Sequence, residues 1–154
     1  MIKLIAFDLD GTIGETVPMC IRAFEKAVSP YAGRTLSERE ITQTFGLNEV
    51  GMIKMVAGEK WQEALHDFYP VYEKMHEECP EPYEGIRELI NTLKKEGILV
   101  ALITGKGEKS CRITLEQFGM QDLFCSVKTG AEDRPNKAEA IGAVSYTHLT
   151  LPTT

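Results

Sequence analysis

The fold is decided by residues 2–12, which read Ile-Lys-Leu-Ile-Ala-Phe-Asp-Leu-Asp-Gly-Thr. The run as far as Phe7 is mostly apolar, and a short apolar run of this kind is typical of a strand buried in a parallel sheet. The polar end of the stretch, from Asp8 to Thr12, predicts a tight turn directly after the strand. We therefore expect the first strand to be buried and its carboxyl end to carry the chemistry of the protein.

Two further apolar runs extend this pattern. Residues 98–103 predict a second strand, again closed by small polar residues, and residues 123–127 predict a third. Helices are predicted between them, over residues 83–97, where apolar side chains recur at i, i+3, i+4 and i+7, and over residues 108–118. This alternation predicts a Rossmann-like α/β core, with a parallel sheet covered by helices on both faces.

The stretch between the first strand and the first of these helices has a different character. Residues 15–79 show apolar side chains at helical spacing and no strong strand signal. One helix is expected from Val17 onward, with Thr16 as its N-cap, and another over 61–72, whose aromatic stripe we assign to the core. We predict a helical cap over 15–79, inserted into a discontinuous core made of residues 1–14 and 80–144.

The C-terminal segment differs in composition from the rest of the chain. No Asp, Glu, Lys or Arg occurs from Ala140 to Thr154, and the end of the segment shows neither helical nor alternating periodicity. It resembles translated sequencing-adapter sequence. We therefore expect residues 145–154 to be a non-native tail and the α/β core to be incomplete at its C-terminal end.

Composition limits the possible partners. The 154 residues are 43% hydrophobic and 26% charged, as in a globular domain, and 17 Lys and Arg against 23 Asp and Glu give a net charge of -6. This balance argues against nucleic acid or an anionic membrane as partner. The N-terminal residues lack a hydrophobic signal segment, so we expect a cytoplasmic location. The four cysteines lack zinc-site or disulfide-framework spacing and are expected to be buried free thiols.

Asp8 and Asp10 are the strongest candidates for chemistry. They lie two residues apart at the end of a strand, so both side chains can point to the carboxyl edge where open α/β sheets bind ligands. Two carboxylates there repel each other unless a cation joins them, and Mg²⁺ prefers such oxygen ligands and also binds phosphate. With Gly11 and Thr12 the pair indicates phosphoryl chemistry. The alternative is an ordinary acidic turn.

The string Asp8-Leu9-Asp10-Gly11-Thr12 is similar to the first motif, DxDGT, of haloacid dehalogenase-like phosphohydrolases, and the resemblance extends from Met1 to about Ala143. It implies that Asp8 is the nucleophile that forms an aspartyl-phosphate and that Asp10 is the general acid and base. It also implies that Mg²⁺ is the cofactor. The predicted metal ligands are the Asp8 carboxylate and the backbone carbonyl of Asp10.

Two later segments resemble the second and third motifs of the family. Thr104 ends the second predicted strand, where its hydroxyl and the following N–H of Gly105 would hold the phosphoryl oxygens. Lys137 resembles the lysine that neutralises the phosphoryl group and the nucleophile, although the usual Lys-Pro dipeptide is absent. Arg134, which precedes a proline, is the competing alignment. Lys106 is expected to be solvated, with contact to the substrate phosphate as the alternative.

The fourth motif, an acidic turn that completes the magnesium site, has no match after Lys137, because Glu132 and Asp133 come too early. The loss of this segment would leave the present chain weak or inert even if its natural form is a phosphatase. The position of the helical insert resembles the phosphoglycolate phosphatase and β-phosphoglucomutase branch. Residues 45–48 resemble a cap loop that faces substrate, or else a helix end stopped by Gly46.

These features together predict a Mg²⁺-dependent phosphatase that hydrolyses a small phosphorylated metabolite, a phosphomonoester, through an aspartyl-phosphate. A phosphosugar mutase of the same family would use the same intermediate. A phospho-accepting receiver-like signalling module is an alternative of another class, although receivers lack a helical insert after the first strand. A non-catalytic fragment that binds partners is the third alternative.

Overall fold

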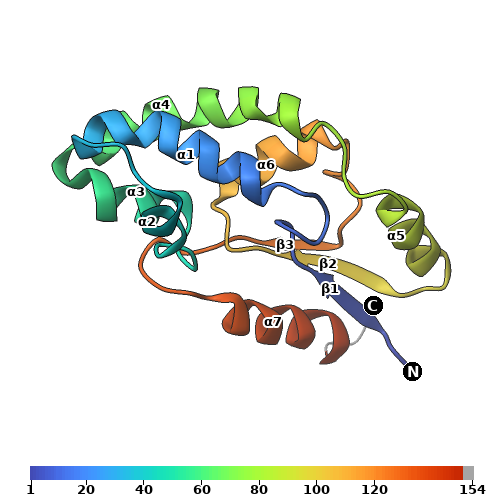
Figure 1. Ribbon diagram of the computed structural model, residues 1–154. Coiled ribbons are helices and arrows are strands. Elements are labelled where there is room, and N and C mark those ends of the chain that lie inside the picture. Colours follow the sequence, from blue (N-terminus) through green and yellow to red (C-terminus); the bar gives the residue numbers. More distant parts are fainter. Residues whose placement is uncertain (151–154) are drawn as a thin grey trace.

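The computed structural model describes residues 1–150 and contains a three-stranded parallel sheet (Figure 1). Its strands are β1 (Leu4–Phe7), β2 (Leu99–Ile103) and β3 (Ser126–Lys128), in the order β1-β2-β3. Leu4 lies opposite Leu99, and Ala101 lies opposite Ser126. The predicted α/β class with a parallel sheet is confirmed.

Helices cover both faces of the sheet. Alternate residues of β2 face opposite sides: Val100 and Leu102 belong to the large core that includes α5 (Ile86–Lys95) and α6 (Glu108–Gln117). Ala101 and Ile103 pack instead against α7 (Lys137–Ser145), which lies alone on the other side in Figure 1. Both predicted helices, over 83–97 and 108–118, are thus present with slightly shorter bounds.

The two longer strands differ in burial, and one prediction is wrong here. Residues Val100–Ile103 of β2 are buried, whereas Ala6 of β1 is exposed and its neighbours in the strand are only half-buried. The reason is position in the sheet, because β2 is paired on both sides and β1, within the described residues, pairs with β2 alone. The expected burial of the first strand is therefore not observed.

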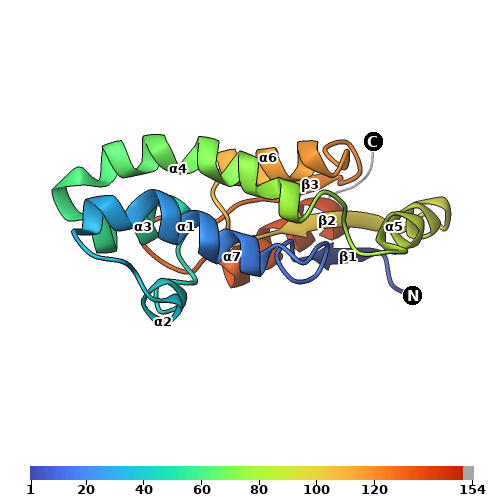
Figure 2. The same ribbon diagram turned by 45° about the horizontal axis from the view of Figure 1, so that its top comes forward.

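Residues 15–79 contain helices and, within the described part of the chain, no named strand. The elements are α1 (Val17–Ala32), α2 (Glu38–Thr42), α3 (Glu49–Ala57), η1 (Gly58–Lys60), α4 (Trp61–Met75) and η2 (His76–Glu78). Figures 1 and 2 show α1 and α4 side by side. The rings of Phe24 and Phe68 meet edge to face between these helices, with their centroids 6.0 Å apart. The division at residues 14/15 and 79/80 into core and cap stays a prediction.

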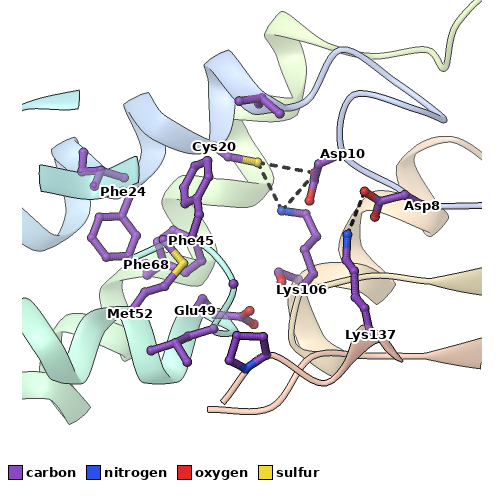
Figure 3. Close-up of a pocket in the computed structure, with 17 residues that line it drawn as sticks. Asp8, Asp10, Cys20, Phe24, Phe45, Glu49, Met52, Phe68, Lys106 and Lys137 are labelled. Atoms are coloured by element: carbon purple, nitrogen blue, oxygen red, sulfur yellow. Dashed lines mark hydrogen bonds and ion pairs between the residues drawn. The ribbon is translucent and has the colours of Figure 1, made fainter. Parts of the chain in front are cut away.

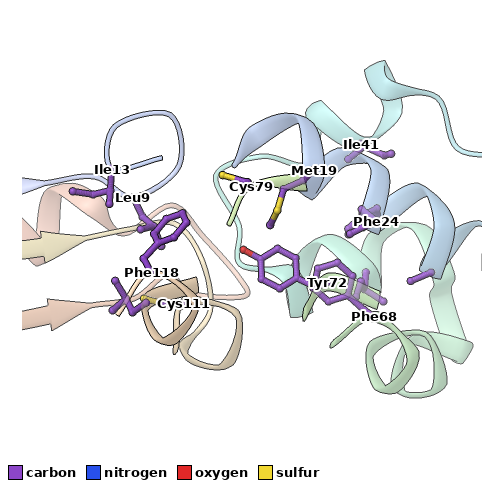
Figure 4. Packing of buried hydrophobic residues seen from close by; sticks show 14 of the residues in the cluster. Leu9, Ile13, Met19, Phe24, Ile41, Phe68, Tyr72, Cys79, Cys111 and Phe118 are labelled. Carbon is purple, nitrogen blue, oxygen red and sulfur yellow. The ribbon is translucent and has the colours of Figure 1, made fainter. Parts of the chain in front are cut away.

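A buried polar network joins α4 to α6. The Tyr72 hydroxyl lies 2.6 Å from Thr114 Oγ1, and His76 Nε2 lies 2.8 Å from the same oxygen. His76 also meets the ring of Phe118 edge-on, and Figure 4 shows Tyr72 and Phe118 within the buried cluster. Because these polar groups are paired inside an apolar core, the network fixes how α4 packs against α6.

Three remaining predictions concern the tail, the membrane and the cysteines. Tyr146–Thr150 form the last described helical turn, η3, and the rest of the predicted non-native tail, residues 151–154, lies outside the described residues. No helix within residues 1–150 has both the length and the apolar character that a membrane span requires. All four cysteines are free; Cys79 and Cys111 are buried, Cys20 is half-buried and Cys125 is exposed, so the prediction of burial is wrong for Cys125.

Candidate active site

A tight turn after β1 presents both aspartates. Gly11 adopts a φ of +75°, which a side chain would strain, and its N–H donates to the Gly14 carbonyl at 2.9 Å. The buried side chains of Leu9 and Ile13 anchor the turn, and the Ile13 N–H donates to the Leu9 carbonyl at 2.9 Å. Sequence reasoning therefore placed the turn correctly, and its rigidity fixes the backbone around Asp8 and Asp10.

The turn opens into a cavity of about 330 Å³ between the sheet edge and the helical segment (Figure 3). Four of the predicted site residues line this cavity, namely Asp8, Asp10, Gly105 and Lys137. The opposite wall comes from α1, α2, α3, α4 and the 45–48 loop and is largely apolar. A small ligand in this cavity would contact both the predicted machinery and the helical segment.

Asp8 and Lys137 form an ion pair at the open side of the cavity. Lys137 Nζ donates to Asp8 Oδ2 at 2.9 Å, while the Leu9 N–H donates to Asp8 Oδ1 at 2.8 Å. The lysine comes from the first residue of α7, and the two side chains are 48% and 38% exposed. Arg134, the competing candidate, pairs instead with Asp133 and Glu139 on the surface. Lys137 is thus the candidate that reaches Asp8.

Asp10 has a different lysine, and this pairing was missed. Lys106 Nζ lies 3.3 Å from Asp10 Oδ1, 3.2 Å from Cys20 Sγ and 4.6 Å from the centre of the Tyr72 ring. Its side chain is only 11% exposed. Burial lowers the pKa of Lys106, but the charge of Asp10 and the contacts with Cys20 and Tyr72 together outweigh burial, so the net pKa is raised. The expectation of a solvated Lys106 is wrong.

The hydroxyl of Thr16 completes the surroundings of Asp10. Thr16 occupies the N-cap position of α1, as predicted, but its side chain makes no capping hydrogen bond. It donates to Asp10 Oδ1 instead. The Asp10 carboxylate is therefore held from two sides, by Thr16 and by Lys106.

Thr104 lies beneath the cavity wall rather than in it. It is 1% exposed, its N–H donates to the Lys128 carbonyl at 2.9 Å, and its Oγ1 accepts the Lys106 N–H at 3.1 Å. Gly105, the next residue, does line the cavity. The structure thus brings the predicted Thr104–Gly105 turn to the site, while the phosphate-binding role of both residues stays a prediction.

Glu49 is a charged cavity residue that sequence reasoning missed. It is the first residue of α3, is 5% exposed, and accepts the Gly107 N–H at 2.7 Å and the Tyr69 hydroxyl at 3.2 Å. Burial, followed by the charge of Glu49, raises the pKa of Tyr69, so this hydroxyl remains a donor. The carboxylate thereby covers the N-terminus of α6, where a negative charge is favourable.

The loop before Glu49 is hydrogen-bonded to the segment that follows β3. The Asn48 N–H donates to the Ala131 carbonyl at 2.8 Å, and its side-chain amide donates to the Gly130 carbonyl at 3.2 Å. Phe45 and Leu47 line the cavity. Of the two interpretations of residues 45–48, the loop that faces the cavity is the one that the geometry favours.

The carboxylate oxygens of Asp8 and Asp10 are hard donors of the kind that Mg²⁺ prefers. Mg²⁺ keeps several waters and is commonly held by one or two carboxylates together with substrate phosphate, so this donor set fits the ion. Within residues 1–150 no group of three or more His, Cys, Asp or Glu side chains forms a metal site. Glu132 and Asp133 pair with Lys54 and Arg134.

The fold and the site define a class: an α/β protein with two aspartates, a strand-end Thr-Gly turn and a lysine at the carboxyl edge of its sheet. Comparison with known families is consistent with this class. The haloacid dehalogenase-like hydrolases match residues 5–143. The chain belongs to this family, as its sequence motifs predict.

Individual relatives agree with the family. The chain is 26% identical over 123 residues to the pyrophosphatase PpaX of Halalkalibacterium halodurans, covering 80% of the chain and 57% of that protein. It is 29% identical over 147 residues to the phosphoglycolate phosphatase of Vibrio cholerae, covering 88% of the chain and 65% of that protein. The chain thus spans less than two thirds of the length of these curated relatives.

A solved structure supports the fold. The structure of a predicted phosphoglycolate phosphatase from Haemophilus somnus superposes with a TM-score of 0.77 at 21% sequence identity. The match covers 97% of this chain and 72% of that one. At this level of identity the likeness concerns the arrangement of helices and strands, and it confirms the predicted Rossmann-like architecture.

Proposed function

We propose that the protein is a Mg²⁺-dependent phosphatase that hydrolyses a small phosphomonoester. The observation that carries this proposal is the Asp8–Lys137 ion pair beside Asp10 at the mouth of a ligand-sized cavity. A carboxylate next to a half-exposed lysine can attack phosphorus while the ammonium stabilises the charge on the phosphoryl oxygens. Family membership favours this reaction over a receiver-like signalling module.

The proposed reaction has two steps. An Asp8 carboxylate oxygen forms a bond to phosphorus, the ester P–O bond breaks, and Asp10, which has first taken up a proton from solvent, passes this proton to the leaving alcohol. Asp10 then takes a proton from water, whose oxygen bonds to phosphorus as the bond to Asp8 breaks, so phosphate is released and both aspartates are restored. Lys137, the Thr104 hydroxyl and the Gly105 N–H hold the phosphoryl oxygens.

Asp8 and the backbone carbonyl of Asp10 would hold Mg²⁺, with the Asp10 side chain as the other candidate ligand. When bound, the ion would neutralise phosphate charge and reduce repulsion between the substrate and the carboxylates. The two lysines that line the cavity are each paired with one of these aspartates, at 2.9 and 3.3 Å, so both aspartate charges are balanced before substrate binds. We propose a small phosphorylated metabolite as substrate and the cytoplasm as location, with neither nucleic acid nor membrane as partner.

Phosphate release from p-nitrophenyl phosphate tests the proposal. We expect release with Mg²⁺, none after chelation, and loss of activity to the uncatalysed level in Asp8→Asn, because the amide is not a nucleophile for phosphorus. Asp133→Asn is the matched control, since Asp133 is exposed and pairs only with Arg134 among the described residues. Full activity of Asp8→Asn would contradict the proposal, and an inert unmodified chain would favour the non-catalytic alternative. Conversion of a phosphosugar without phosphate release would identify a mutase.

A further inference from the structure

The cavity beside Asp8 is apolar where the leaving group of a substrate would lie. Its far wall is formed by Phe24, Ile41, Phe45, Met52 and Phe68, which come from α1, α2, α3, α4 and the 45–48 loop. Figure 3 shows Phe24, Phe45, Phe68 and Met52 grouped together, across the cavity from the two aspartates. Apolar ligand groups are stabilised by such a wall at about 25 cal/mol for each Å² removed from water.

Both cations of the cavity are already paired. Its described lining contains two cations, Lys106 and Lys137, and each is paired with an aspartate, at 3.3 and 2.9 Å. Lys106 is nearly buried by Cys20 and the Tyr72 ring, and is thereby held at Asp10. A second anionic group on a substrate would therefore meet no unpaired lysine or arginine in the described lining.

Glu49 adds a negative charge to the same wall. Its carboxylate is fixed by the Gly107 N–H and the Tyr69 hydroxyl, and Figure 3 places it between Met52 and Lys106. Like charges repel each other strongly in a cavity that is partly shielded from water. An anionic leaving group would have to approach this carboxylate.

We infer that the site prefers phosphomonoesters with an uncharged, apolar leaving group, such as an aryl or arylmethyl alcohol, over esters that carry a carboxylate or a second phosphate. The inference rests on the proposed function and deepens it. It separates this chain from what the names of its relatives suggest, because phosphoglycolate and pyrophosphate both carry a second anionic group. The cavity volume of about 330 Å³ falls within the range of small-ligand pockets, roughly 300–1,000 Å³.

Binding of two phosphonates tests the preference without requiring turnover. Benzylphosphonate carries an apolar ring and phosphonoacetate a carboxylate, and neither has an ester bond to cleave. With Mg²⁺ present, isothermal titration calorimetry on the full chain should give a dissociation constant at least about tenfold lower for benzylphosphonate, equivalent to about 1.4 kcal/mol. Equal affinity, the reverse order, or binding of neither compound would overturn the inference.

A pair of lysine substitutions locates the preference in the cavity. Phe45 is 46% exposed and lines the cavity, so Phe45→Lys should fold while replacing an apolar wall with a cation. It should weaken benzylphosphonate binding and strengthen phosphonoacetate binding, each severalfold. Met55→Lys adds the same charge at a position on α3 that is 64% exposed and outside the lining. Equal effects of the two substitutions would overturn the assignment of the cavity.

Phosphate release from benzyl phosphate and from 2-phosphoglycolate separates the two proposals. Faster hydrolysis of benzyl phosphate supports both, whereas faster hydrolysis of 2-phosphoglycolate supports the phosphatase and overturns the leaving-group preference. Selective binding of benzylphosphonate with no hydrolysis of any ester supports the preference and counts against the phosphatase. The two substrates are both esters of primary alcohols, which keeps differences in leaving-group reactivity small.

Discussion

The two lysine–aspartate pairs of the site contain the same chemical groups in different surroundings. Lys137 and Asp8 are 48% and 38% exposed, whereas Lys106 and Asp10 are 11% and 26% exposed. Lys106 is also held by Cys20 and the Tyr72 ring. An exposed pair contributes little to stability, while removal of one partner from a buried pair leaves an uncompensated charge.

This difference assigns different tasks to the two lysines. Lys137 can leave Asp8 at small cost and contact a phosphoryl group when substrate arrives. If Lys106 left Asp10, a buried charge would remain without a partner. Lys106 therefore stays in place and acts as a positioning residue for the Asp10 carboxylate. The comparison therefore separates a lysine that serves the proposed reaction from one that serves the architecture of the site.

The largest expected effect is on the exposed pair and concerns catalysis. Lys137→Met removes the ammonium that would stabilise the transferring phosphoryl group, and we expect kcat for p-nitrophenyl phosphate to fall by about 10²–10³, as for other lost electrostatic contacts. The free energy of unfolding should change by less than about 1 kcal/mol, because the pair is half-exposed. Steady-state kinetics and urea unfolding measure the two quantities. An unchanged rate would favour Arg134 over Lys137 as the residue that contacts the phosphoryl group.

The buried pair should show the opposite pattern, with stability as the main readout. Lys106→Met leaves Asp10 partly buried without its cation and should lower the free energy of unfolding by about 2–3 kcal/mol, below the roughly 3–5 kcal/mol seen for fully buried pairs. Urea unfolding at pH 7 measures this loss, with Lys137→Met as the matched control. Equal destabilisation by the two substitutions would remove the distinction between the pairs.

The next prediction concerns the pH dependence of the free energy of unfolding, which reports on the buried Cys111 thiol. Burial raises the pKa of the Cys111 thiol from 9.0 to about 11, although the charge of Lys106 lowers it. A raised folded-state pKa means that the folded protein holds this proton more tightly. The resulting stabilisation is complete below about pH 9 and is lost as pH rises through about 11.

The free energy of unfolding should therefore fall between pH 9 and 11, by up to about 1.4 kcal/mol per pH unit for this thiol. Cys111→Ala should flatten that fall, whereas Cys125→Ala, which removes an exposed thiol, serves as the control for loss of a thiol. Lys106→Met should extend the fall to higher pH, because it removes the charge that lowers the Cys111 pKa. Identical pH profiles for all these proteins would contradict the buried environment.

What the sequence predicts well is local. The helical periodicity of residues 83–97, the apolar run of β2 and the contiguous Asp8–Thr12 string each carry their signal within a few residues. The burial of β1 was predicted wrongly because it depends on which elements flank the strand, and residues 2–7 contain no information about that. Lys137 was identified only because a family motif supplies its distant relation to Asp8.

The missed features all join residues far apart in the chain. Lys106 meets Asp10 across 96 positions, and Glu49 meets Gly107 across 58. Neither Lys106 nor Glu49 differs locally from an ordinary surface residue, and nothing in the printed sequence marks its partner. Such contacts depend on how α3 and α4 pack against the ends of the strands. This packing is not encoded in the local sequence around either residue.

Glu49 offers the smallest and most specific test of that packing. Among the described residues it forms no ion pair with a lysine, in contrast to Asp8 and Asp10, and its carboxylate instead accepts the Gly107 N–H at 2.7 Å. Glu49→Gln keeps the shape but replaces a charged acceptor at the N-terminus of α6 by a neutral one. We expect the free energy of unfolding to fall by about 1 kcal/mol.

Urea unfolding of Glu49→Gln beside Glu73→Gln, an exposed position on α4, measures this contribution. The loss at Glu49 should shrink only slightly in 0.5 M salt, because a buried charge is poorly screened, whereas an effect at an exposed glutamate should disappear. A Glu49→Gln protein as stable as the Glu73→Gln control would mean that helix α3 does not hold its charge against α6. The Glu49 carboxylate would then be free to bind ligand. The contrast between Glu49, held by hydrogen bonds, and the two aspartates, paired with lysines, would no longer hold.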